Sequence, residues 1–252
     1  ERSDTWWGEE PKVKNITVNF IPDESTRLLA AQCGDIDVAF NVPLAQSTQW
    51  ENLDTMRVDY VNDLSYVGLY FNTTVAPFDD PKVREAINLL IDRDSIQKFI
   101  YGRGGTATAS FVNEPKQFKS QKLKYEFNIE KANKILDEAG YKKGSDGIRE
   151  KDGKKLKYVY QTSINAPRQK TQAIIKQACQ KVGIDLELKS VTASVFFSSD
   201  VANPDTYTKL YVDMEMYTTT QPQPDPERFL NQFVSWEIAN KENKWLGRNV
   251  SR

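Results

Sequence analysis

The chain has 252 residues, of which 34 are basic and 35 acidic, and it contains no histidine. This length allows one large domain or two modest ones, each with a core of its own. The net charge of -1 gives no electrostatic reason to expect nucleic acid or an anionic membrane surface as a partner. The missing histidine excludes Ser-His and Cys-His catalytic pairs, and zinc sites that use imidazole.

The sequence shows neither a membrane span nor a signal peptide. No run approaches the roughly 18 apolar residues of a transmembrane helix, and the start, ERSDTWWGEE, lacks the basic and apolar regions of a signal peptide. We therefore expect a chain that is cytoplasmic or already trimmed. The two cysteines, Cys33 and Cys179, fall in separate helical patterns, which predicts free and at least partly buried thiols.

The first part of the chain predicts alternating strands and helices. The predicted elements are strands at 13–21, 37–40, 55–61 and 64–72, and helices at 23–34 and 43–50. Apolar and polar side chains alternate along 13–21, as expected for a strand, and 37–40 is predicted to be a short buried strand. Strand, helix and strand in this order favour a crossover unit in a mainly parallel sheet.

Asp79 and Asp80 precede an amphipathic helix. Apolar residues recur at the helical period between 83 and 91, and Asp80 stands immediately before Pro81, the arrangement of an N-cap followed by a first-turn proline. Two neighbouring carboxylates can also divide the roles of acid and base. We favour the cap, because adjacent side chains at a helix start diverge in direction.

The remainder of the chain predicts a second crossover unit. Its predicted elements are helices at 94–101, 128–140 and 167–183, strands at 156–162, 184–191 and 210–220, and a closing helix through Phe229, Phe233 and Trp236. Asp152-Gly153 is a strong signal for a two-residue hairpin turn. The strands at 156–162 and 184–191 flank a helix, which predicts a parallel pair.

The stretch EMYTTTQPQPDP, residues 215–226, is a candidate ligand site. It places an aromatic ring and three threonine hydroxyls where a strand meets a loop, and loops beyond the carboxyl ends of strands are favoured ligand sites in α/β sheets. The alternative is a solvated threonine turn with a core tyrosine. Asn72, Thr73 and Thr74 allow the same two interpretations.

The stretch YVGLYFNTTVAPFDDPKVREAINLLIDRDSI resembles the signature of the family 5 extracellular solute-binding proteins, the peptide, nickel and glycoside receptors of ABC importers. The part of that signature written P-F-D-D-x-x-V-R-x-A is matched in full by Pro77 to Ala86. Further segments, among them NIEKANKILDEAGY and DPERFLNQF, follow in the family's order and extend the resemblance over nearly the whole chain.

This resemblance implies an α/β fold of the periplasmic-binding-protein type II kind, represented by a truncated fragment. Residues 1–73 would be an incomplete returning segment of lobe I, and residues 74–252 would be most of lobe III, incomplete at its C-terminus. In the family the ligand is enclosed between these two lobes, and lobe closure couples binding to docking on the membrane permease.

The resemblance also implies a ligand site. The predicted ligand-binding residues are Tyr70, Asn72, Tyr217, Thr218, Thr219, Thr220 and Gln221. Pro222 is a departure, because peptide-binding members commonly place there an Asp that pairs with the amino terminus of the ligand. A neutral loop cannot make that contact, so a sugar, an opine-like compound or a capped peptide fits at least as well as a free peptide.

We therefore expect the solute-binding component of an ABC importer. It would capture a peptide or a similar small polar ligand outside the cytoplasmic membrane and deliver it to the permease, as a monomer without catalysis, cofactor, metal or nucleic acid. Its location would be periplasmic or extracytoplasmic, with membrane association through the transporter. The alternatives are a carboxylate-dependent hydrolase that uses Asp79 or Asp80, and a sensor module that presents ligand on the same fold.

Overall fold

A computed structural model describes residues 1–61 and 63–247 of the chain. The chain divides into two compact units, Glu1–Tyr60 and Val61–Arg252. Residues 248–252, which end the predicted lobe III range of 74–252, lie outside the described residues. No helix in the described part is long and apolar enough to cross a membrane.

The first unit contains three short helices, α1 (Glu24–Cys33), η1 (Leu44–Gln46) and α2 (Ser47–Glu51). Asp23 caps α1, because its Oδ1 accepts a hydrogen bond from Thr26 N at 2.7 Å. Gly34 ends the helix in the left-handed region at φ 77°.

The three strands predicted within this unit, at 13–21, 37–40 and 55–61, are wrong. None of these segments has strand structure among the described residues, and the crossover unit predicted from them is absent. Most of their apolar side chains are exposed to solvent, with Phe20 91% and Phe40 80% exposed. Alternation is a local signal, whereas a strand also requires a hydrogen-bonded neighbour.

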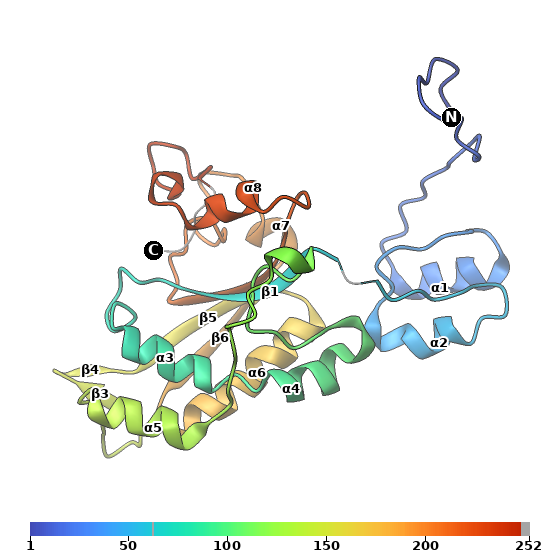
Figure 1. Cartoon of the computed structure of the whole chain (residues 1–252). Coiled ribbons are helices and arrows are strands. Elements are labelled where there is room, and N and C mark those ends of the chain that lie inside the picture. The colour runs from blue at the N-terminus through green and yellow to red at the C-terminus, as the bar shows by residue number, and fades with distance from the viewer. Residues whose placement is uncertain (62, 248–252) are drawn as a thin grey trace. The chain divides into compact units, whose positions relative to one another are not determined.

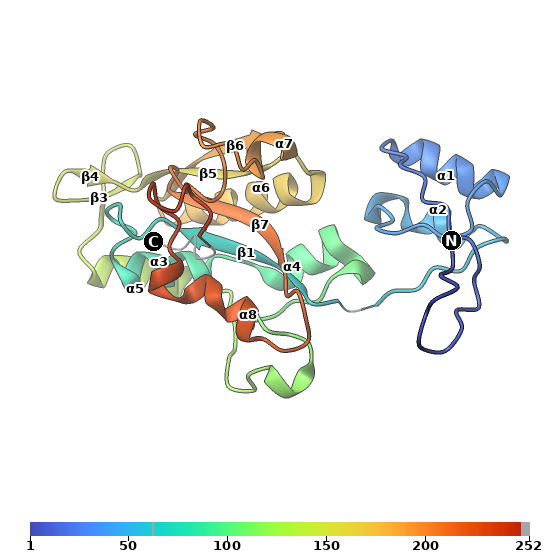
Figure 2. The same ribbon diagram turned by 90° about the horizontal axis from the view of Figure 1, so that it is seen from above.

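The second unit is built on a four-stranded sheet (Figures 1 and 2). Its strand order is β1 (Ser65–Phe71), β7 (Met214–Thr220), β5 (Lys157–Ser163) and β6 (Asp185–Val191). The predicted parallel pair of β5 and β6, joined by helix α6 (Ala166–Lys181), is confirmed. β7 is also parallel to β5, whereas β1 runs antiparallel to β7.

One face of this sheet packs against helices. Figure 1 shows α3 (Pro81–Leu89), α5 (Ile129–Glu138) and α6 on one side, and the short helices α7 (Ala193–Phe196) and α8 (Glu227–Leu230) on the other. Leu136, Ile175 and Met214 are among the buried residues that join the first three helices to the strands in one core.

The opposite face carries a separate aromatic cluster. Side chains alternate between the two faces of a strand, so Met214 and Met216 enter the helical core while Tyr217 turns away from it. Tyr217 joins Tyr70 and Phe196 in a second buried cluster. The two-residue period of β1 and β7 therefore places tyrosines together on the face that lacks the large helices.

Side-chain caps begin several helices of this unit, and the predicted cap Asp80 is confirmed. Asp80 Oδ1 accepts from Lys82 N at 2.8 Å at the start of α3, and Asp92 caps α4 (Arg93–Ile96). A π-helical turn, η2 (Gln97–Tyr101), continues α4. Asn128 accepts from Lys131 N at the start of α5, also at 2.8 Å.

The remaining elements are short. They are η3 (Gly102–Gly104), η4 (Lys116–Phe118), β2 (Lys142–Lys143), β3 (Arg149–Lys151), β4 (Lys154–Lys155), η5 (Asn231–Phe233) and η6 (Ser235–Glu237). The predicted hairpin is confirmed, because β3 and β4 pair across Asp152 and Gly153, which have φ of 52° and 74°. The predicted closing helix is instead divided among α8, η5 and η6.

The two cysteines are free, as predicted. Cys179 is buried within α6, whereas Cys33, at the end of α1, is exposed. The prediction that both thiols are at least partly buried is therefore wrong for Cys33, which lies outside the short buried stripe of α1.

Candidate functional site

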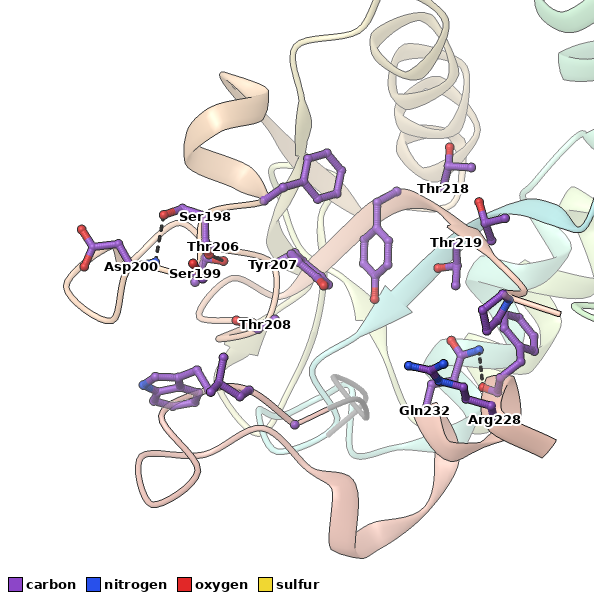
Figure 3. Close-up of a pocket in the computed structure, with 18 residues that line it drawn as sticks. Ser198, Ser199, Asp200, Thr206, Tyr207, Thr208, Thr218, Thr219, Arg228 and Gln232 are labelled. Atoms are coloured by element: carbon purple, nitrogen blue, oxygen red, sulfur yellow. Dashed lines mark hydrogen bonds between the residues drawn. The ribbon is translucent and has the colours of Figure 1, made fainter. Parts of the chain in front are cut away.

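A groove of about 600 Å³ opens on the sheet face that carries the aromatic cluster (Figure 3). All of its walls belong to the second unit. The lining residues are Phe197, Ser198, Ser199, Asp200, Thr206, Tyr207, Thr208, Tyr217, Thr218, Thr219, Thr220, Pro222, Arg228, Phe229, Gln232, Trp245, Leu246 and Gly247. Aromatic rings and hydroxyl groups dominate this lining.

Paired tyrosines from β1 and β7 form the base of the groove. The rings of Tyr70 and Tyr217 stack at a centroid distance of 4.2 Å with an interplanar angle of 5°. The Tyr70 hydroxyl is 2.6 Å from the Tyr66 hydroxyl and 2.9 Å from Thr219 Oγ1. Tyr66 also donates to Gln232 Oε1 at 3.4 Å. This chain of hydrogen bonds holds Thr219 and Gln232 in place at the groove.

The tyrosines of the site remain neutral at physiological pH. Burial raises the pKa of Tyr70, and hydrogen bonds from Thr219 and Tyr66 offset part of this effect. The pKa of Tyr217 is raised well above its usual value, chiefly by burial, and that of Tyr207 is raised by burial and by the nearby Glu215. These residues offer ring faces and neutral hydroxyl groups to a ligand, and none is suited to act as a general base.

Buried Lys209 holds one wall of the groove. Its ammonium group donates hydrogen bonds to the carbonyl oxygens of Val201 and Asn203, the latter at 2.6 Å. The same group lies 5.8 Å from the ring centroid of Trp245. Lys209 thus connects the loop that carries Ser198 to Asp200 with the segment that carries Trp245, although the two are far apart in sequence.

Five of the predicted site residues come together at the groove. Tyr217, Thr218, Thr219 and Thr220 line it, and Tyr70 lies against Tyr217. Figure 3 shows Thr218 and Thr219 on the strand that crosses the site. Their contact with a ligand stays a prediction.

Asn72 and Gln221 are not among the lining residues. Asn72 donates from Nδ2 to the carbonyl oxygen of Leu210 at 2.9 Å, and its Oδ1 accepts from Thr74 Oγ1 at 2.6 Å. Gln221 donates from Nε2 to the carbonyl oxygens of Gln223 and Pro224, at 2.7 and 2.9 Å. Both side chains use their hydrogen bonds within the protein, and their predicted contact with a ligand is likewise untested.

Asp79 and Asp80 lie outside the groove lining. Asp80 uses one carboxylate oxygen to cap α3, and the other accepts a hydrogen bond from the Tyr141 hydroxyl at 3.2 Å. Burial, together with the charge of Asp80, raises the pKa of Tyr141 to about 12. The described residues contain no group of three or more His, Cys, Asp or Glu side chains that could hold a metal ion.

Several lining residues were not predicted from the sequence. The segment FFSSD, residues 196–200, combines rings, hydroxyls and a carboxylate after a predicted strand, a pattern that indicates a ligand-binding loop. Arg228 lies within DPERFLNQF, a segment that resembles the family. Only the tertiary fold places it in the same groove as Thr219. Trp245 follows the last predicted helix, and no local pattern marks it.

A known family matches most of the chain. The model of the family described as "Bacterial extracellular solute-binding proteins, family 5 Middle" matches residues 1–241. The oligopeptide-binding protein AppA of Bacillus subtilis is 31% identical over 198 residues, which cover 76% of this chain and 36% of that protein. The nickel-binding periplasmic protein of Escherichia coli is 30% identical over 195 residues, with coverage of 74% and 37%.

The chain is also similar in fold to solved structures of solute-binding proteins. AppA of Bacillus subtilis in complex with a nonapeptide has a TM-score of 0.71 and 26% identity, and the match covers 91% of this chain and 44% of that one. NikA of Brucella suis in complex with Fe(III)-EDTA has a TM-score of 0.76 over 98% of this chain and 48% of that one; at 24% identity it supports the fold alone. The chain thus spans less than half the length of these proteins.

Proposed function

The chain belongs to the family 5 bacterial extracellular solute-binding proteins, and from this premise we propose that it captures a small polar solute for an ABC importer. The default ligand is a peptide, bound outside the cytoplasmic membrane and delivered to the membrane permease. Oligopeptide-binding and nickel-binding relatives support a role in solute binding, and the chemistry of the groove favours the organic ligand.

The observation that carries this proposal is the groove itself. Its volume of about 600 Å³ lies within the range of small-molecule sites, roughly 300–1,000 Å³. The rings of Tyr207, Tyr217 and Phe197 offer apolar faces, and the threonines of β7 offer hydroxyl groups. Such a surface binds organic solutes by ring packing and neutral hydrogen bonds.

Neither a catalytic role nor a nucleic-acid partner belongs to the proposal. Burial raises the pKa of the groove tyrosines and so keeps them neutral, and Asp80 uses both of its carboxylate oxygens within the fold. We expect a monomer with an extracytoplasmic location, which reaches the membrane through its permease. A net charge of -1 offers no general attraction to nucleic acid.

The lobe arrangement is also part of the proposal. Residues 1–73 would be a returning segment of lobe I, and residues 74–252 would belong to lobe III. β1 pairs with β7 within the second compact unit. The residues that precede β1 would therefore connect this sheet to the rest of lobe I.

A thermal-shift and calorimetric screen of short peptides and sugars tests this function. A ligand present at one hundred times its Kd stabilises the folded state by about 2.7 kcal/mol, which is readily measured. Phe197→Ala removes a ring from the groove wall, so we expect binding about tenfold weaker in this variant, equivalent to about 1.4 kcal/mol.

Phe99→Ala provides the matched control, because Phe99 is exposed and lies outside the groove lining. It should leave the affinity unchanged. If no peptide or sugar binds the chain, or if both variants lose affinity equally, the assignment of the groove as the solute site is contradicted.

A further inference from the structure

The lining of the groove contains two charged residues, Arg228 and Asp200. Figure 3 shows them at opposite ends, with Tyr207 between them. Arg228 lies beside Gln232, below Thr219, whereas Asp200 lies on the distant loop that follows Ser198. The groove therefore has a positive end and a negative end.

The backbone of Arg228 is held firmly. Arg228 lies on α8, where Glu227 N donates to Asp225 Oδ1 at 2.9 Å and Leu230 N donates to the carbonyl oxygen of Pro226 at 2.8 Å. The next residue, Phe229, is buried and packs edge-on against the Tyr66 ring at 5.9 Å. The position from which the Arg228 side chain extends is thus fixed by its neighbours.

The guanidinium group of Arg228, by contrast, has no hydrogen bond or ion pair with the described residues. The neighbouring polar groups are already engaged, because Gln232 Nε2 donates to the carbonyl oxygen of Phe229 at 3.0 Å and Thr219 bonds to Tyr70. A guanidinium group has five N-H donors in a planar fork that matches a carboxylate. None of the described residues occupies these donors at the wall of the groove.

We propose that Arg228 receives a carboxylate group of the solute and so fixes the direction in which the solute lies in the groove. One guanidinium group balances a single negative charge, which fits a carboxylate better than a dianionic phosphate. Asp200 repels an anion from the other end and so reinforces the same direction. This inference rests on the proposed solute-binding function and adds to it the chemical class of the ligand.

The test compares pairs of short peptides, each prepared as the free acid and as the C-terminal amide. Calorimetry with the wild-type chain should show the free acid binding about tenfold more tightly, a preference that decreases as ionic strength rises. Arg228→Gln should reduce the preference to about one, while the affinity for the amide changes little. Arg228→Lys, which keeps the charge but not the fork, should retain part of the preference.

Arg57→Gln is the matched control, because Arg57 is an exposed arginine that pairs with Asp59 outside the groove. This variant should keep the wild-type preference. A preference for the free acid that persists in Arg228→Gln, or peptide binding that ignores the terminal carboxylate, would overturn this inference alone. If neither member of any pair binds the wild-type chain, the peptide-binding function is contradicted as well.

Discussion

Asn72 is the residue that ties the end of β1 to the segment leading into β7. Its backbone N-H donates to the carbonyl oxygen of Asp213 at 2.9 Å, and its side chain donates to the carbonyl oxygen of Leu210. Leu210 is fully buried and has a φ of 45°, a conformation that few non-glycine residues adopt. The amide of Asn72 therefore supports an unusual turn beneath the site.

We expect Asn72→Ala to lower the free energy of unfolding by about 1–3 kcal/mol, because a buried carbonyl oxygen loses its donor. Urea denaturation measures this loss. Thr73→Ala is the control, since the Thr73 side chain makes no hydrogen bond to the described residues, and it should change stability by less than about 0.5 kcal/mol. Equal stability of the two variants would show that the hydrogen bonds of Asn72 contribute little.

The adjacent residues Asp79 and Asp80 make a second matched pair. Asp80→Ala removes the cap of α3 and the acceptor of the Tyr141 hydroxyl, and should lower the free energy of unfolding by about 0.5–2 kcal/mol. Asp79→Ala should have little effect on stability, because Asp79 is exposed and lies before the cap position. Similar losses in both variants, measured by thermal denaturation, would contradict the capping role.

At the scale of elements, the sequence predicts those features that depend on interactions between neighbouring residues, such as helix caps and turns. The Asp80 cap and the Asp152-Gly153 turn follow from interactions within a few residues, and both are found. The strand-helix-strand unit of β5, α6 and β6 was also predicted, because its parts are consecutive in sequence.

The candidate site was only partly predictable for the same reason. The aromatic and hydroxyl residues of β7 are visible as one stretch, whereas Phe197, Arg228 and Trp245 reach the groove through tertiary contacts. The position of Asn72 in a family signature predicts contact with a ligand, but it does not reveal that the side-chain amide donates to the carbonyl oxygen of Leu210. The strand predicted at 13–21 is absent because alternation along one segment does not supply a partner strand.

Two of the segments that line the groove, the 197–206 loop and the segment that carries Trp245, contact Lys209. We expect Lys209→Met to loosen the 197–206 loop and the Trp245 segment together, because the ammonium group that holds the carbonyl oxygens of Val201 and Asn203 is lost. Hydrogen-deuterium exchange should rise in both segments, and the free energy of unfolding should fall by about 1–3 kcal/mol.

Lys170→Met on the exposed face of α6 removes the same charge without these contacts and should leave exchange unchanged. If exchange in Lys209→Met rose in one segment only, the role of Lys209 as a link between the two groove walls would be refuted.

At the scale of the whole molecule, the two compact units differ greatly in burial. Among the described residues of Glu1–Tyr60, the buried apolar side chains are Ala31 and Trp50. Ordering a residue costs roughly 1–2 kcal/mol of backbone entropy, whereas full burial of a large apolar side chain stabilises by roughly 1.5–3 kcal/mol. So small a core cannot hold the first unit as firmly as the continuous core of the second.

Limited proteolysis should therefore cut the first unit first. Trypsin has lysine and arginine sites throughout the chain, so the order of cleavage reports local opening rather than the distribution of sites. We expect mass spectrometry to show early cuts before residue 61 and a resistant product that contains β1 and β7.

Digestion in urea is the control for this experiment, because both units should then be cut at similar rates. A ligand that binds the groove should further slow cleavage of the second unit, since it stabilises the folded form to which it binds. Early cleavage within residues 63–247 in native buffer would contradict this order of stability, and would mean that the sheet carrying the groove opens more readily than its buried core predicts.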